Sequence, residues 1–203
     1  MLDARRRTLL PLRTMTVLEI VAFLLGLANV TLVVLRSIWN YIFGLAMVAL
    51  YAIIFLDARL YSDALLQVFF FVVQIYGWWN WSRVRAQAGE VTIGLLTNRT
   101  RLRWAIGCLI AAALWGFGMH RFTNAALPWA DATLAVMSIA AQTLQSRRTV
   151  ESWWLWIAVD IGSLGLYAAK GLWLTMLLYA IFLGLAIWGL LDWQRVARRT
   201  VAA

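Results

Sequence analysis

The stretches WNYIFGLAMVALYAIIFL (residues 39–56) and ALLQVFFFVVQIYGWWNW (residues 64–81) each contain 18 residues and no charged side chain. A lipid bilayer has a hydrocarbon core of about 30 Å, which a helix of about 20 apolar residues crosses. Each stretch is therefore long enough to form a membrane-spanning helix. Because only a short connection (57–63) separates the two stretches, the helices must be antiparallel neighbours. This pattern predicts a polytopic α-helical membrane protein.

The same pattern recurs along the rest of the chain. Further apolar stretches cover residues 16–34, 104–119, 127–144, 152–169 and 172–191. Of the 203 residues, 64% are hydrophobic and 13% are charged, against roughly 45–50% and about 25% in soluble domains. The 13 tryptophans also favour a membrane protein, because indole rings concentrate at membrane interfaces. We therefore predict seven transmembrane helices.

The connections between these predicted helices differ in length and charge. Arg36 and Lys170 mark tight turns, whereas residues 82–103 form a predicted polar loop with five arginines. Three helices would be followed by one connecting helix and then by three more helices. In this order the first and second sets of three helices, which we call the two triplets, have the same orientation in the membrane. We divide the chain into a basic segment (1–15), a first three-helix bundle (16–81), a basic loop with a connecting helix (82–126), a second three-helix bundle (127–195) and a tail (196–203).

Basic residues predict the orientation. Of the 18 Lys and Arg residues, eleven lie on the side of the odd-numbered connections and the C-terminus. Cytoplasmic loops carry the excess of positive charge, which favours a cytoplasmic C-terminus. The arginines at positions 5–7 precede an apolar stretch long enough to span the bilayer, so we expect a retained first helix rather than a cleaved signal peptide.

Several classes of function are disfavoured. The arginines that give the chain its formal charge of +9 lie between apolar stretches, where they orient the helices in the membrane. Nucleic-acid binding is therefore not expected. Cys108 and His120 are the single cysteine and histidine, which disfavours metal sites, Ser-His-Asp catalysis and a bound cofactor. A membrane-embedded enzyme would need such a site. A seven-helix receptor, the other alternative, would need a larger output region than the short segment after residue 191.

Weak self-similarity relates the two predicted triplets. Gly77, Asn80 and Trp81 correspond to Gly189, Asp192 and Trp193 at one constant offset in the numbering, which also relates Tyr61 to Trp173. We call this the repeat offset. Leu50-Tyr51 corresponds to Leu166-Tyr167 at a slightly larger offset. Parallel repeats of this kind occur in transporters, which bind substrate between the halves near the bilayer midplane.

Polar and aromatic residues align on one face of several predicted helices. At about 100° per residue, five residues of the sixth helix fall within an arc of about 80°: Trp153, Trp156, Asp160, Ser163 and Tyr167. Polar groups in a membrane usually face a bundle interior or a wet cavity, so we expect these faces to meet. The candidate ligand-contacting residues are Asn40, Gln67, Gln74, Trp78, Trp153, Trp156, Asp160, Tyr167 and Tyr179.

A cavity lined in this way favours a small, cationic, aromatic and hydroxylated ligand. Tryptophan and tyrosine rings stack on flat rings and attract cations, and amides bind hydroxyl or carboxamide groups. Asp160 would offset positive charge, or serve as a buried hydrogen-bond acceptor if it is protonated. Structural roles compete with this interpretation, since Gln67 and Gln74 can join neighbouring helices. The tryptophans predicted to be interfacial anchors instead are Trp39, Trp104, Trp129, Trp173 and Trp193.

The segments YSDALLQ (residues 61–67) and IYGWWNW (residues 75–81) resemble the PnuC family of bacterial vitamin B3 transporters. The segments RSIWN (residues 36–40) and ESWWLW (residues 151–156), with Asp160 and Tyr167, resemble the same family. The likeness covers about residues 20–195.

This resemblance implies two parallel three-helix repeats joined by one helix, as in SWEET sugar transporters, and a homotrimer. It implies facilitated diffusion of nicotinamide riboside, which a cytoplasmic kinase then traps by phosphorylation. Family relatives carry thiamine or riboflavin, and the predicted cavity does not separate the riboside from thiamine. Trp153 and Trp156 would then stack on the base, Asn40, Gln67 and Gln74 would hold polar groups, and Asp160 would offset charge.

Overall fold

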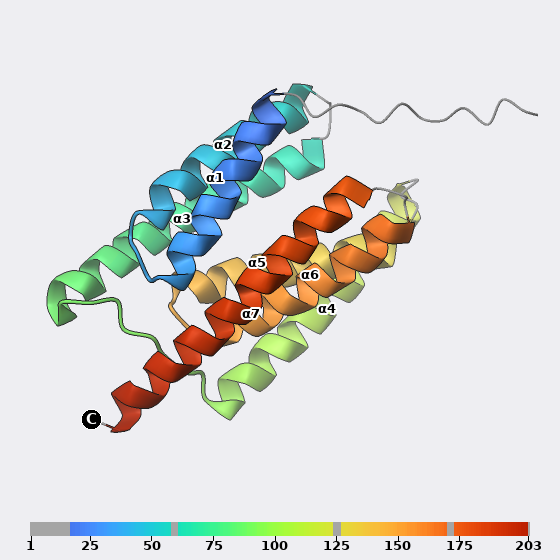
Figure 1. Ribbon diagram of the computed structural model, residues 1–203. Helices are drawn as coiled ribbons and strands as arrows, with labels where there is room; N and C mark the ends of the chain where they lie inside the picture. The colour runs from blue at the N-terminus through green and yellow to red at the C-terminus, as the bar shows by residue number, and fades with distance from the viewer. Residues whose placement is uncertain (1–16, 58–60, 124–126, 170–172, 203) are drawn as a thin grey trace, which may run out of the picture.

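The computed structural model describes residues 17–57, 61–123, 127–169 and 173–202. These residues form seven α-helices (Figure 1), in which the backbone hydrogen bonds are satisfied within each helix, as a chain in lipid requires. The basic segment expected at residues 1–15 and the turn expected at Lys170 lie outside the described residues. The helices are α1 (Val17–Val34), α2 (Asn40–Asp57), α3 (Tyr61–Ala88), α4 (Asn98–Phe122), α5 (Pro128–Ser146), α6 (Glu151–Ala169) and α7 (Trp173–Ala202).

Six of these helices form a closed ring. Helix α2 packs against α1 and α3, and α6 packs against α5 and α7. The two triplets meet where α3 contacts α5 and where α7 contacts α1, and they lie side by side in Figure 1. Among the described helices, α4 packs against α5 alone, so it lies outside the ring. All six ring helices can therefore direct side chains toward one central space.

Two helix ends related by the repeat offset have the same backbone structure. Arg36 follows α1 with a φ of 55°, and Arg148 follows α5 with a φ of 61°. This left-handed conformation ends many helices. The Ser37 amide donates to the Leu32 carbonyl at 2.9 Å, and the equivalent bond from Thr149 to Leu144 measures 3.2 Å. The offset is the one that relates the third and seventh predicted helices in the sequence.

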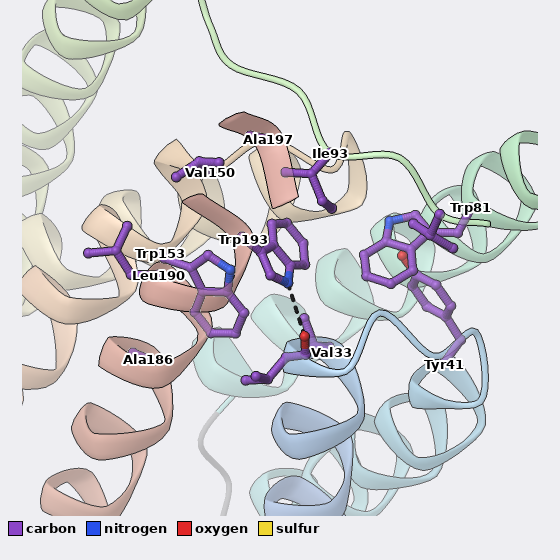
Figure 2. Packing of buried hydrophobic residues seen from close by; sticks show 12 residues of the cluster. Val33, Tyr41, Trp81, Ile93, Val150, Trp153, Ala186, Leu190, Trp193 and Ala197 are labelled. Atoms are coloured by element: carbon purple, nitrogen blue, oxygen red, sulfur yellow. Dashed lines mark hydrogen bonds between the residues drawn. The ribbon is translucent and has the colours of Figure 1, made fainter. Parts of the chain in front are cut away.

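A cluster of four aromatic residues joins the two triplets at the end of the ring that holds these turns (Figure 2). Tyr41 and Trp81 meet edge to face with ring centroids 5.4 Å apart, and Trp153 and Trp193 do the same at 5.4 Å. The repeat offset relates these two pairs as well. Trp81 and Trp193, one from each triplet, lie 5.8 Å apart. We call Tyr41, Trp81, Trp153 and Trp193 the aromatic cluster.

The two indoles at the centre of this cluster are fully buried and hydrogen-bonded to the opposite triplet. Trp81 donates to the Gln145 carbonyl at 3.3 Å, and Trp193 donates to the Val34 carbonyl at 3.2 Å, the dashed line in Figure 2. The prediction that Trp193 is an interfacial anchor is therefore wrong, because its exposed fraction is 0%. Its N–H satisfies a carbonyl that the end of α1 leaves free.

The prediction of a polar loop over residues 82–103 is wrong at both ends, because α3 continues to Ala88 and α4 begins at Asn98. Arginine favours helices, and its charge is solvated outside the bilayer, so the helices extend beyond the apolar stretches. Gly89, with a φ of 77°, follows the end of α3. The remaining loop crosses the ring end and pairs with the α5–α6 turn, where the Val150 amide donates to the Gly94 carbonyl at 3.1 Å.

The outer surface of the bundle is apolar. On α4, large hydrophobic side chains such as Leu109 and Leu114 are exposed, which suits lipid contact. By length and composition, Asn98–Phe122 and Met176–Arg199 are long and apolar enough to cross a membrane, and Ile20–Val34 and Asn40–Ile54 are shorter apolar helices. Polar residues that face the ring interior lower the mean hydropathy of the other helices.

Gly189→Ala is expected to destabilise the protein, because a Cβ at this position would lie against the Trp153 ring. Overpacking of this kind costs about 1–3 kcal/mol, and we expect a destabilisation in this range. Gly184→Ala is the matched control, since it lies in the same helix and its Cβ would meet no atom within 4 Å. Thermal melting in detergent should show a lower midpoint for Gly189→Ala alone, and equal midpoints would contradict this packing.

Candidate functional site

A cavity of about 370 Å³ occupies the centre of the ring. All six ring helices line it, and α4 contributes no side chain. The aromatic cluster lies between this cavity and the ring end that holds the α1–α2 and α5–α6 turns. Most of the lining is apolar, and the residues with polar groups are Asn29, Tyr51, Gln67, Gln74, Gln142, Gln145, Trp153, Trp156, Asp160, Tyr167 and Tyr179.

Asp160 gives the cavity its charge. Among the described lining residues it is the one with an ionisable carboxyl group, and no Lys or Arg lines the cavity. The residue is 4% exposed, and its carboxylate accepts no hydrogen bond from the described part of the chain. A buried charge without a partner is costly, so the site favours a ligand that brings positive charge.

Two tryptophans of α6 line the cavity in different ways. The Trp156 indole N–H donates to Oε1 of Gln145 on α5, which fixes the orientation of the ring. Trp153 is 1% exposed and packs against Trp193 and the Gly189 backbone. Its indole Nε1 is buried and has no hydrogen-bond partner among the described residues. Trp153 therefore offers the cavity no free ring face, and the expectation that it stacks on a base is corrected.

Amide side chains from α1 and α3 meet over a glycine of α2. A Cβ at Gly44 would overlap Oε1 of Gln74 and Nδ2 of Asn29, so the close approach of these amides requires glycine. Asn29 Nδ2 also donates to the Asn40 carbonyl at 2.7 Å. The amide of Gln74 lies in the cavity wall, where it can bind a ligand hydroxyl or carboxamide.

Tyrosines of α6 and α7 line the part of the cavity farthest from the aromatic cluster. Tyr167 and Tyr179 stack with ring centroids 5.2 Å apart, and Phe182 meets Tyr179 edge to face at 6.2 Å. Tyr51 of α2 lines the same cavity. The cavity is thus bounded by aromatic rings along its length.

The structure brings seven of the nine predicted ligand-contacting residues to the cavity: Gln67, Gln74, Trp153, Trp156, Asp160, Tyr167 and Tyr179. Asn40 and Trp78 do not line it, and their predicted placement is corrected. Asn40 is 2% exposed and donates to the Ser37 carbonyl at 2.6 Å, so it stabilises the start of α2. Trp78 is 38% exposed on the surface of α3.

Four cavity residues with polar groups were missing from the prediction, namely Asn29, Tyr51, Gln142 and Gln145. Asn29 lies in the first apolar stretch, Gln142 lies near the end of the fifth, and Gln145 directly follows that stretch. Amides inside membrane helices are costly unless they are paired or face a cavity. The i, i+3 spacing of Gln142 and Gln145 places them on one helix face, and this was the signal that could have found them.

Comparisons with known proteins agree on one family. Residues 16–195 match the family model described as nicotinamide mononucleotide transporter. The nicotinamide riboside transporter PnuC of Escherichia coli is 33% identical, over 89% of this chain and 86% of that protein. The riboflavin/roseoflavin transporter RibM of Streptomyces davaonensis is 30% identical, over 89% of this chain and 86% of that protein. A crystal structure of the vitamin B3 transporter PnuC matches with a TM-score of 0.73 and 29% identity, covering 90% of this chain and 82% of that one.

Proposed function

Because this chain belongs to the nicotinamide mononucleotide transporter family, and is thus a membrane transporter rather than an enzyme, we propose that it carries nicotinamide riboside by facilitated diffusion. The observation that supports this substrate is the unpaired carboxylate of Asp160 in a cavity walled by aromatic rings and amides. Nicotinamide riboside is a small pyridinium cation with a carboxamide and ribose hydroxyls. Its parts match the three kinds of side chain in the wall.

Each part of the substrate has a proposed partner. The ring of Trp156, oriented by Gln145, stacks on the pyridinium, and Asp160 offsets its charge. Gln67 and Gln74 bind the remaining polar groups. The sequence has no Walker-type phosphate loop for ATP. The proposed transport runs down the gradient of the riboside, and a kinase that traps the product inside the cell maintains this gradient.

Riboflavin is the second candidate, because RibM of Streptomyces davaonensis is 30% identical to this chain. Thiamine is a third, because it is also a cationic aromatic. Riboflavin is neutral, so the charge of Asp160 favours the riboside or thiamine over it. Competition binding on the purified protein with all three vitamins separates these candidates. Displacement of labelled riboside by the unlabelled riboside, with weaker displacement by the other two, supports the proposal.

Uptake into proteoliposomes tests transport itself. Labelled nicotinamide riboside should enter vesicles down its gradient without ATP, and excess unlabelled riboside inside should exchange with it. Binding in detergent without uptake or exchange would contradict a carrier and favour a receptor.

We also propose that α1–α3 and α5–α7 are two parallel repeats joined by α4, in the three-plus-one-plus-three arrangement of SWEET transporters. Support comes from the positions that share their structure at the repeat offset: Arg36 and Arg148, Tyr41 and Trp153, and Trp81 and Trp193. A homotrimer in the bacterial inner membrane, with a cytoplasmic C-terminus, completes this proposal. Mass measurement in detergent tests the trimer, and labelling of a cysteine placed after residue 199 tests the orientation.

An ion pair supports an alternating-access mechanism between these repeats. Arg36 in the α1–α2 turn pairs with Asp192 of α7, and the side chains are 27% and 32% exposed. The equivalent positions lack this pair: Asn80 donates to the Ser146 carbonyl at 2.9 Å, and Nε of Arg148 is buried without a described partner. The pair and the aromatic cluster therefore hold one end of the ring closed. Transport requires both to separate.

Asp192→Asn is expected to favour opening of this end. Partly exposed ion pairs contribute about 1 kcal/mol or less, and about 1 kcal/mol changes the ratio of two conformations roughly fivefold. Asn80→Asp is the complementary variant, since it gives Arg148 a carboxylate and should favour closure. Exchange rates in proteoliposomes should change in opposite directions for the two variants. A change in the same direction would contradict the role of the pair.

A further inference from the structure

The structure contains a second concave site, on the outside of the ring between α4 and α5. This groove has a volume of about 340 Å³. Thr100, Arg103 and Trp104 line one end of it. Small residues, including Gly107 and Ala111 of α4 and Ala140 of α5, line the rest. A Cβ at Gly107 would meet no atom within 4 Å, so these short side chains leave space between the two helices.

The shape of the groove fits one acyl chain. From Arg103 to Ala111 the helix rises about 12 Å at about 1.5 Å per residue. One leaflet contributes about half of the roughly 30 Å hydrocarbon core. The groove therefore follows most of the depth of one leaflet, starting at its polar surface. Trp104 lies at this boundary, where indole rings concentrate.

The charge at the polar end of the groove is unbalanced. Arg101 pairs with Glu151 of α6 at 2.7 Å. Arg99 and Arg103 have no ion pair or hydrogen bond within the described ranges, and both are exposed. Their i, i+4 spacing places them on one face of α4, where like charges repel. An anion between the two guanidinium groups would remove this repulsion.

We propose that the α4–α5 groove binds an anionic phospholipid, with the headgroup phosphate between Arg99 and Arg103 and an acyl chain over Gly107. Basic pockets between membrane helices bind anionic headgroups in this way. A zwitterionic lipid carries its own cation next to the phosphate, which the two arginines repel. This site is separate from the central cavity, because α4 contributes nothing to that cavity, and the proposal does not depend on which vitamin is carried.

Native mass spectrometry of the full chain tests this proposal. The protein is purified from an equimolar mixture of phosphatidylglycerol and phosphatidylcholine, and the retained lipids are counted. The wild-type protein should retain phosphatidylglycerol with a preference of about thirtyfold, which corresponds to about 1 kcal/mol for each of the two basic side chains near the anionic headgroup. The Arg99→Gln/Arg103→Gln variant should lose this preference. Arg198→Gln/Arg199→Gln removes the same charge from exposed positions of α7 and should keep it.

A second variant tests the acyl-chain part without altering charge. Gly107→Leu fills the groove and should lower the amount of retained phosphatidylglycerol. Gly118→Leu, in the same helix with no atom within 4 Å of its Cβ, should not. A wild-type protein without lipid preference, or equal loss in both arginine variants, would overturn the proposal. A change in oligomer mass in Gly107→Leu with unchanged lipid retention would also overturn it, since a second copy of the chain would then occupy the groove.

Discussion

Asp160→Asn is expected to weaken the binding of nicotinamide riboside by about 3 kcal/mol, which is a loss of roughly two orders of magnitude. The carboxylate is 4% exposed and has no hydrogen-bond donor among the described residues, so its field acts on the ligand with little screening. Two unit charges about 4 Å apart interact with about 4 kcal/mol at an effective dielectric constant of 20. Asparagine keeps the size of the side chain and removes the charge. Calorimetric titration measures the change.

The ligand itself provides the sharpest control for this prediction. Dihydronicotinamide riboside has nearly the same shape but no positive charge, so Asp160→Asn should leave its affinity almost unchanged. Asp131 in the first turn of α5 does not line the cavity, and Asp131→Asn should leave both affinities as in the wild type. If Asp160→Asn weakened the charged and neutral ligands equally, Asp160 would act through the structure of the cavity rather than through its charge.

The helices could be predicted from the sequence because the bilayer sets their minimum length. Each apolar stretch became a helix where the structure describes it. Their ends were less predictable, because a helix that leaves the membrane can continue in water. The arginines after residue 81 extend α3 to Ala88, and the segment predicted as a tail continues α7 to Ala202. Hydropathy indicates where lipid ends, and not where the helix ends.

The sequence predicted which face of each helix lines the site better than it predicted which positions along the helix do so. The rule of about 100° per residue identifies a helix face but not the depth at which that face is exposed to the cavity. Trp78 shares a face with Gln74, yet it lies one turn closer to the ring end that the aromatic cluster fills, and there it is exposed. Asn40 lies at the helix start, where its amide serves the turn instead.

The repeat offset relates more positions of similar structure than the few identical residues in the sequence suggested. Tyr41 and Trp153 differ chemically, so a sequence comparison does not relate them. Each packs edge to face on the tryptophan at the equivalent later position, Trp81 or Trp193, with the same centroid distance. The two ring pairs therefore have similar packing although one of their residues differs. The positive φ of Arg36 and Arg148 at the two helix ends could not be predicted from the sequence either. Arginine is not a residue that favours this conformation.

Trp156→Ala is expected to weaken riboside binding by about 1–3 kcal/mol, the range found when an aromatic ring that stacks on a base is removed. This corresponds to a loss of affinity of roughly 5- to 150-fold. Trp154→Ala removes the same ring from the same helix at a position that is 56% exposed and does not line the cavity, so it should bind as the wild type does.

Trp156→Phe separates the two roles of this residue, stacking and the hydrogen bond to Gln145. Phenylalanine keeps a ring for stacking but has no N–H, so Oε1 of Gln145 loses its donor and the ring loses its fixed orientation. We therefore expect an affinity between those of the wild type and Trp156→Ala, and a Gln145→Leu variant should match Trp156→Phe, because either change removes the same bond. If Trp156→Phe were as weak as Trp156→Ala, the indole N–H and not the ring face would determine binding. Wild-type affinity in Trp156→Ala would show that the pyridinium lies elsewhere in the cavity.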